Sequence, residues 1–139
     1  MGDTAKRREK RSGISEILNV YQNALAVGLR AYKLSTRSLA KERYALTDQV
    51  RCSSRSICAN IAEACRKRRY DAAFIAKLSD AEGEAAEMQV HLELAFHHSY
   101  LPRSEFLSVD DAYEKIIGQL VKMIDEPEKW LLENSTRRL

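Results

Sequence analysis

The sequence predicts an all-α protein that folds as an antiparallel, up-and-down four-helix bundle. The 139 residues include only 5 Gly and 2 Pro, so few residues interrupt long helices. Apolar residues recur at spacings of three and four in four long segments, and no segment shows the alternation of a strand. A content of 45% apolar and 31% charged residues is typical of a globular helical protein. The links between the segments are short, which favours antiparallel neighbours in sequence order.

The chain divides into three predicted parts. Residues 1–13 are expected to form a basic flexible tail, because they carry charge but no apolar face. Residues 14–126 are expected to form the four-helix bundle. Residues 127–139 are expected to form a short C-terminal extension, in which Trp130 docks against the bundle.

The first two helices are predicted from their apolar spacing. Helix one should begin near Ser15 and fade at Ser35 and Thr36, whose hydroxyls compete for the backbone. Its predicted apolar face consists of Ile14, Ile17, Leu18, Tyr21, Leu25, Leu29 and Tyr32. Helix two is predicted over residues 45–68. Its predicted apolar stripe consists of Leu46, Val50, Ile57 and Ile61.

The last two helices carry clearer start and stop signals. Helix three is predicted over residues 71–100, where apolar residues are spaced alternately by four and three. This seam consists of Phe74, Leu78, Ala81, Ala85, Met88, Leu92, Ala95 and Ser99. Pro102 should end helix three, and Ser104 or Ser108 should cap the start of helix four. Pro127 should stop or kink helix four.

Charge is distributed unevenly along the chain. Residues 1–69 carry 16 Lys and Arg against 6 Asp and Glu, whereas residues 70–139 carry 7 against 14. This asymmetry indicates either an anionic partner for the first half or docking between unlike halves of neighbouring copies. We therefore expect a homo-oligomer.

The strongest basic cluster is the run Arg66, Lys67, Arg68 and Arg69 at the end of helix two. Cations at a helix C-terminus are favoured by about 0.3–1 kcal/mol each, so part of this run needs no partner. Arg51 and Arg55 extend basic charge along the same helix, and the basic residues Lys6, Arg7, Arg8, Lys10 and Arg11 of the tail could assist. The cluster is either a site for nucleic-acid phosphates or a solvated turn. Reading of base sequence is not expected, because no recognised nucleic-acid motif accompanies it.

Helix two also carries a polar stripe beside its apolar one. Its members share one face: Gln49, Ser53, Ser56, Asn60 and Glu63. Polar groups so close to a core seam must find partners. The stripe is therefore interpreted as a structural hydrogen-bond ladder between helices or subunits, with a ligand site as the alternative.

No catalytic residue, metal site or cofactor is predicted. The acidic residues of helix three lack the Glu-x-x-His pairs that build di-metal centres in bundles. Cys52, Cys58 and Cys65 contain no CxxC pair, no signal peptide precedes them, and no eighteen apolar residues run together. A cytoplasmic protein that does not enter a membrane is expected.

The residues of helix two also resemble a known family. The run from Tyr44 through Gln49 and Arg51 to the block Ala59-Asn60-Ile61-Ala62-Glu63 is similar to that of the four helix bundle proteins called 23S rRNA intervening-sequence proteins. Residues 17–24 resemble the first-helix signature of the family, and Ala81 and Gly83 with Glu87 resemble the third. Two positions depart from the family pattern, since Ala64 and Glu84 stand where the family usually has Gly and Ser.

The resemblance covers about residues 14–125 and carries several implications. It implies a left-handed bundle, assembly as a ring that is commonly a pentamer, and no enzymatic activity. It also implies similarity to the accessory proteins of diversity-generating retroelements, which partner a reverse transcriptase and nucleic acid.

Two functions follow as expectations. The first is a ring-forming, non-enzymatic protein whose basic surface binds RNA or DNA phosphates. The alternative is a structural or adaptor protein that binds another protein, with its basic charge used at subunit interfaces. A carboxylate enzyme using Glu63 and Glu87 is the least favoured class.

Overall fold

The computed structural model describes the backbone of residues 2–37 and 46–132, and the side chains of residues 15–37 and 46–132. Its elements are α1 (Gly2–Arg37), α2 (Leu46–Arg66), α3 (Asp71–His97), α4 (Arg103–Asp125) and the 3-10 turn η1 (Pro127–Lys129). The described residues contain no strand, which confirms the all-α class and the four helices. The up-and-down topology, the left-handed sense and the ring assembly stay predictions.

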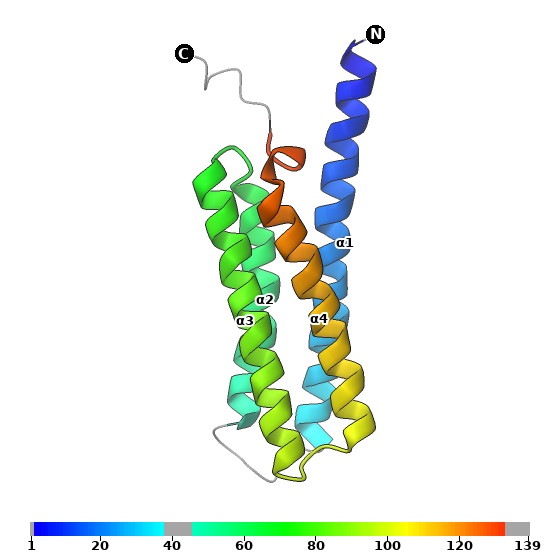
Figure 1. Cartoon of the computed structure of the whole chain (residues 1–139), viewed down its shortest axis with the longest axis vertical. Coiled ribbons are helices and arrows are strands. Elements are labelled where there is room, and N and C mark those ends of the chain that lie inside the picture. Colours follow the sequence, from blue (N-terminus) through cyan, green and yellow to red (C-terminus); the bar gives the residue numbers. More distant parts are fainter. Residues whose placement is uncertain (1, 38–45, 133–139) are drawn as a thin grey trace.

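The four long helices lie side by side around one core (Figure 1). α2 packs against α1 and α3, and α4 packs against α3 and α1. The turn between α2 and α3 lies at the same end of the bundle as η1, and the α3–α4 connection lies at the other end (Figure 1). Residues that are far apart in the sequence therefore meet at the α2–α3 turn.

The start of α1 differs from the prediction. The helix begins at Gly2 and not near Ser15, so the backbone of the expected tail continues α1. Its first turns project beyond the other helices in Figure 1. The side chains of Lys6, Arg7, Arg8, Lys10 and Arg11 lie outside the described residues, as does that of Ile14.

The predicted apolar face of α1 was largely wrong. The core face is shifted by one residue and consists of Ile17, Val20, Ala24, Val27, Ala31 and Leu34. Ala24 and Ala31 are almost completely buried, and α1 approaches α2 at Gly28, where an added Cβ would lie 3.7 Å from Ser54 Cβ. Four larger apolar residues remain exposed on α1, and we call them the α1 stripe: Leu18, Leu25, Leu29 and Tyr32.

The seam of α3 was predicted correctly except at its last member. All seven residues from Phe74 to Ala95 in the predicted seam are buried. Ser99 instead lies beyond the end of α3 with a φ of 62°. There the Tyr100 backbone N–H donates to the Ala95 carbonyl at 2.9 Å, which closes the end of the helix.

The boundaries of α2 and α4 also differ by a few residues. α2 ends at Arg66 and not at Arg68. α4 begins at Arg103, with Pro102 at the N-cap in place of Ser104 or Ser108. The extended conformation of Pro102 ends the preceding turn, and its carbonyl accepts the first hydrogen bond of the helix, from Phe106 N at 3.0 Å.

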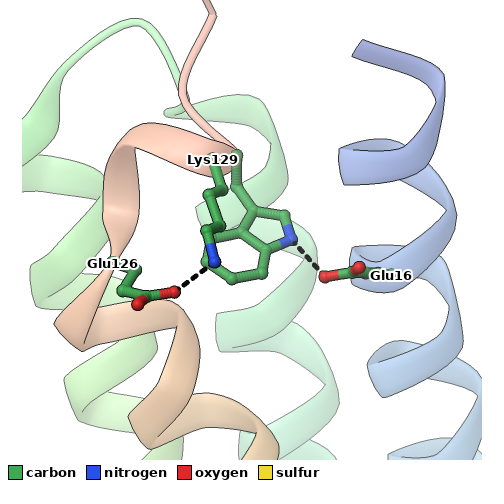
Figure 2. A network of polar contacts seen from close by, with 4 residues as sticks. Glu16, Glu126 and Lys129 are labelled. Atoms are coloured by element: carbon green, nitrogen blue, oxygen red, sulfur yellow. Dashed lines mark hydrogen bonds and ion pairs between the residues drawn. The ribbon is translucent and has the colours of Figure 1, made fainter. Parts of the chain in front are cut away.

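The segment after α4 docks on the bundle as predicted, and we call residues 127–132 the C-terminal strap. Trp130 is 3% exposed, and its indole Nε1 donates to Glu16 Oε2 of α1 at 3.0 Å (Figure 2). Lys129 pairs with Glu126 at the end of α4 (Figure 2). The backbone N–H of Leu132 donates to the Arg68 carbonyl at 3.0 Å, which ties the strap to the α2–α3 turn.

Candidate functional site

A tight turn gathers the basic cluster at one end of the bundle. The Lys67 backbone N–H donates to the Glu63 and Ala64 carbonyls at 3.1 and 3.0 Å, which closes α2. The Tyr70 N–H then donates to the Lys67 carbonyl at 3.0 Å, and α3 begins at the next residue. We call Arg66, Lys67, Arg68 and Arg69 the basic turn. Ala64, two residues before it, is fully buried.

The four cations of the basic turn differ in exposure. Arg66, Lys67 and Arg69 are exposed, whereas Arg68 is half-buried. Arg68 Nε donates to the Cys65 carbonyl at 3.0 Å, so part of its guanidinium caps the end of α2. The basic turn therefore presents three exposed cations, whereas Arg68 is half-buried and contacts the end of α2.

A groove lies beside the basic turn, between α1 and α2. It has a volume of about 560 Å³. Its apolar lining comes from both helices and consists of Ile17, Leu18, Tyr21, Ile61, Ala62 and Cys65. Its remaining lining consists of Arg66, Arg68, Arg69, Tyr70 and Leu132. The sequence did not reveal this groove, because three segments far apart in the chain build it.

Arg51 and Arg55 do not join the basic turn. Arg51 Nε donates to Ser35 Oγ at 3.0 Å, and its guanidinium carbon lies 4.9 Å from the centre of the Tyr32 ring. This side chain therefore ties α2 to α1. Arg55 is exposed, but it stands 11 residues before Arg66, or about 16 Å along the helix axis.

The polar stripe of α2 is buried only in part. Ser53 is 3% exposed, Ser56 and Asn60 are half-buried, and Gln49 and Glu63 are exposed. Asn60 Nδ2 donates to Ser56 Oγ at 3.4 Å within α2. The stripe is therefore not buried throughout, and its role as a structural ladder between helices or subunits stays a prediction.

One member of the stripe joins two helices. Lys77 Nζ of α3 lies 2.8 Å from Glu63 Oε2 of α2. The hydrogen bond and the charge of Lys77 lower the pKa of Glu63, and the same contact raises the pKa of Lys77. Both groups are therefore charged at neutral pH, and Glu63 serves as a salt-bridge partner.

A second basic pocket lies at the opposite end of α1. It has a volume of about 250 Å³, and its cations are Arg30, Lys33 and Arg37. Arg30 Nη2 donates to Ser108 Oγ of α4 at 2.6 Å. This pocket was not predicted, because its cations do not form a consecutive run in the sequence. Their common spacing of three and four is the signal that places them on one face.

Other kinds of site receive little support from the described residues. No group of three or more His, Cys, Asp or Glu gathers to hold a metal ion among the described side chains. No helix in the described part of the chain is long and apolar enough to cross a membrane. The Tyr113 hydroxyl is buried with no hydrogen-bond partner among these residues, and burial raises its pKa.

Comparison with known proteins places these features in a family. The model of the 23S rRNA-intervening sequence proteins matches residues 16–122. The chain is also similar to a crystal structure of a protein of unknown function from the S23 ribosomal protein family of Bacteroides thetaiotaomicron VPI-5482. The two chains share 27% identity with a TM-score of 0.72, over 79% of this chain and 98% of the other. No curated protein matches the chain. The four helices and the match over residues 16–122 show that the chain belongs to the 23S rRNA-intervening sequence protein family.

Proposed function

We propose that the protein is a non-enzymatic, ring-forming homo-oligomer that binds nucleic-acid phosphates through the basic turn. The observation that carries this proposal is the clustering of three exposed cations in one tight turn. A flexible nucleic-acid backbone can reach such a turn without disturbing the core. The membership in a family named after an rRNA element is consistent with a nucleic-acid partner.

The α1 stripe supports the proposed homo-oligomer. Three of its members, Leu25, Leu29 and Tyr32, are 42–56% exposed although they are large and apolar, while Leu18 lines the groove beside the basic turn. A contiguous apolar stripe on a helix marks a surface for another protein. α3 and α4 expose carboxylates, among them Glu87, Glu93 and Asp111, which can meet the basic first half of a neighbouring copy. A head-to-tail contact of this kind closes into a ring if the rotation allows, and we propose a pentamer.

Assembly would strengthen a weak phosphate site. Each copy contributes one basic turn, and repeated sites on one ring raise the overall affinity without any new contact. The α1 stripe also supports the alternative, an adaptor that binds a different protein. The two functions differ in what the basic turn does, so binding of nucleic acid distinguishes them.

We also propose a reducing, cytoplasmic setting. Cys52, Cys58 and Cys65 all lie on α2 and are free thiols. Cys58 and Cys65 stand seven residues apart, or about 10 Å along the helix, which exceeds the Cα separation of about 7 Å that a disulfide can span. The cysteines of one chain therefore cannot pair without unfolding α2.

The test compares two variants that remove the same charge. The first variant replaces Arg66, Lys67 and Arg69 by Ser. The matched control replaces three other exposed cations by Ser, namely Arg103, Lys115 and Lys122. Binding to labelled duplex DNA and RNA is followed by fluorescence anisotropy as salt is raised.

Removal of three phosphate contacts should reduce the slope of log K against log salt by about 2.7 for a duplex. The control variant should keep most of the slope. Equal losses in the two variants would assign binding to net charge alone and contradict a site at the basic turn.

A further inference from the structure

We propose that the groove beside the basic turn holds an unpaired nucleobase, so that single-stranded nucleic acid is the preferred ligand. This inference rests on the proposed function and names the form of nucleic acid that the same site selects. It depends on three features of the groove, namely its apolar lining, its aromatic rings and its cationic edge.

The apolar lining of the groove can pack against the flat face of a nucleobase. Leu18 and Tyr21 of α1 and Ala62 of α2 line it, and the buried side chains of Ile17 and Ile61 also contribute. The volume of about 560 Å³ falls within the range of about 300–1,000 Å³ for small-molecule sites. A nucleobase that enters the groove removes part of this apolar surface from water, which is favourable.

Tyr70 supplies an exposed ring from a backbone position that hydrogen bonds fix. Its side chain is 62% exposed, yet its N–H donates to the Lys67 carbonyl and its carbonyl accepts from Phe74 N at 2.9 Å. The ring therefore stands on a rigid turn, while Tyr21 contributes a second, half-buried ring from α1. Stacking of a base on such a ring is tolerant of base identity, because every base has a π-face.

The cationic edge of the groove selects a ligand that carries phosphates. Arg66, Arg68 and Arg69 line the groove together with Tyr70. A nucleotide whose base occupies the apolar part can therefore place its phosphate beside a guanidinium. In a duplex the base faces are stacked on their neighbours, so a base must be unpaired to enter.

The same chemistry favours nucleic acid over an acidic peptide. Guanidinium planes and phenol rings both stack on bases, and the groove offers both kinds of surface. Leu132 of the C-terminal strap borders the groove through its hydrogen bond to the Arg68 carbonyl. An acidic peptide can pair with the cations of this groove, but its carboxylates have no π-face to stack on the rings.

The experiment separates the base from the phosphate. The full-length protein is titrated at one low salt concentration with labelled oligothymidylate, with an abasic strand of the same number of phosphates, and with a blunt duplex. The variants are Tyr70→Ala and Tyr70→Phe, which retains the ring. Leu107→Ala is the control, because Leu107 is a large exposed apolar residue on α4. Circular dichroism checks that all variants fold.

The unmodified protein should bind oligothymidylate about tenfold more tightly than the abasic strand, because one stacked base contributes about 1–3 kcal/mol. Tyr70→Ala should reduce oligothymidylate binding to the abasic level and leave the abasic strand unaffected. Tyr70→Phe and Leu107→Ala should bind both strands as the unmodified protein does.

Several results would overturn the inference. Equal binding of the normal and abasic strands would leave the proposed phosphate site intact but exclude a base in the groove. Unchanged binding of oligothymidylate by Tyr70→Ala would also exclude a base stacked on Tyr70 and leave the proposed phosphate site intact. Binding of a poly-glutamate peptide as tight as that of oligothymidylate, and equally sensitive to Tyr70→Ala, would assign the groove to acidic proteins. Failure of every nucleic acid to bind would overturn the proposed function as well.

Discussion

Replacing Trp130 by Ala should strongly destabilise the protein. Trp130 is buried against the bundle, and it fixes the C-terminal strap. Truncation of a buried Trp to Ala costs about 3–5 kcal/mol, out of about 5–15 kcal/mol for a typical domain. For a chain of this length, 1 kcal/mol corresponds to about 3–5 °C, so Tm should fall by about 10 °C or more.

A second variant separates packing from hydrogen bonding at Trp130. Trp130→Phe keeps an aromatic ring but removes the Nε1 donor to Glu16. Glu16 is exposed, so water can replace the lost donor, and the hydrogen bond itself should account for only about 1 kcal/mol. Leu107→Ala, an exposed control, should change Tm by little. Thermal unfolding followed by circular dichroism measures all three variants. A fall in Tm of less than 2 °C for Trp130→Ala would refute the docking of the strap.

Further predictions concern the ends and the faces of the helices. Ser99→Gly should stabilise the protein by about 0.5–1 kcal/mol, because Gly adopts positive φ without the strain of a side chain; a lower Tm would contradict this. Glu63→Gln should lower Tm at pH 7, where the pair with Lys77 is charged, and have no effect at a pH low enough to protonate Glu63. Folding lowers the pKa of Glu63, so its pair with Lys77 stabilises the fold above the ordinary pKa of Glu, and this stability is lost as pH falls through the lowered pKa. A difference in Tm that persists in acid would refute this prediction. A double variant, with Leu25→Glu and Leu29→Glu, should keep its helicity but dissociate the oligomer in sedimentation experiments. An intact oligomer would exclude the α1 stripe as its interface.

The fold could be predicted furthest where one apolar seam continues without a break. In α3, the seam from Phe74 to Ala95 keeps its spacing of four and three and is buried throughout, whereas the apolar residues outside it, Val90 and Leu94, are exposed. In α1, two registers one residue apart both carry apolar side chains. The larger residues, such as Leu25 and Leu29, suggested the wrong one, because the core accommodates Ala24 and Ala31 where α1 approaches α2.

The candidate site was predictable only where it is continuous in the sequence. The basic turn could be found from four consecutive cations, whereas the exposure of each one depends on backbone contacts such as that of Arg68 with Cys65. The groove could not be found, because Leu18, Ala62 and Leu132 meet only in the folded chain. The predicted role of Arg51 in phosphate binding also missed its contacts with Ser35 and Tyr32 across the α1–α2 boundary.

The most direct test of the proposed function is native mass spectrometry of the unmodified protein mixed with a short single-stranded RNA at low ionic strength. One spectrum reports both the number of copies and the number of bound strands. We expect masses of a homo-oligomer, a pentamer in the proposed ring, that carries bound RNA and releases it as the salt concentration is raised. A spectrum of monomers without RNA would contradict both the proposed assembly and the proposed binding of nucleic-acid phosphates.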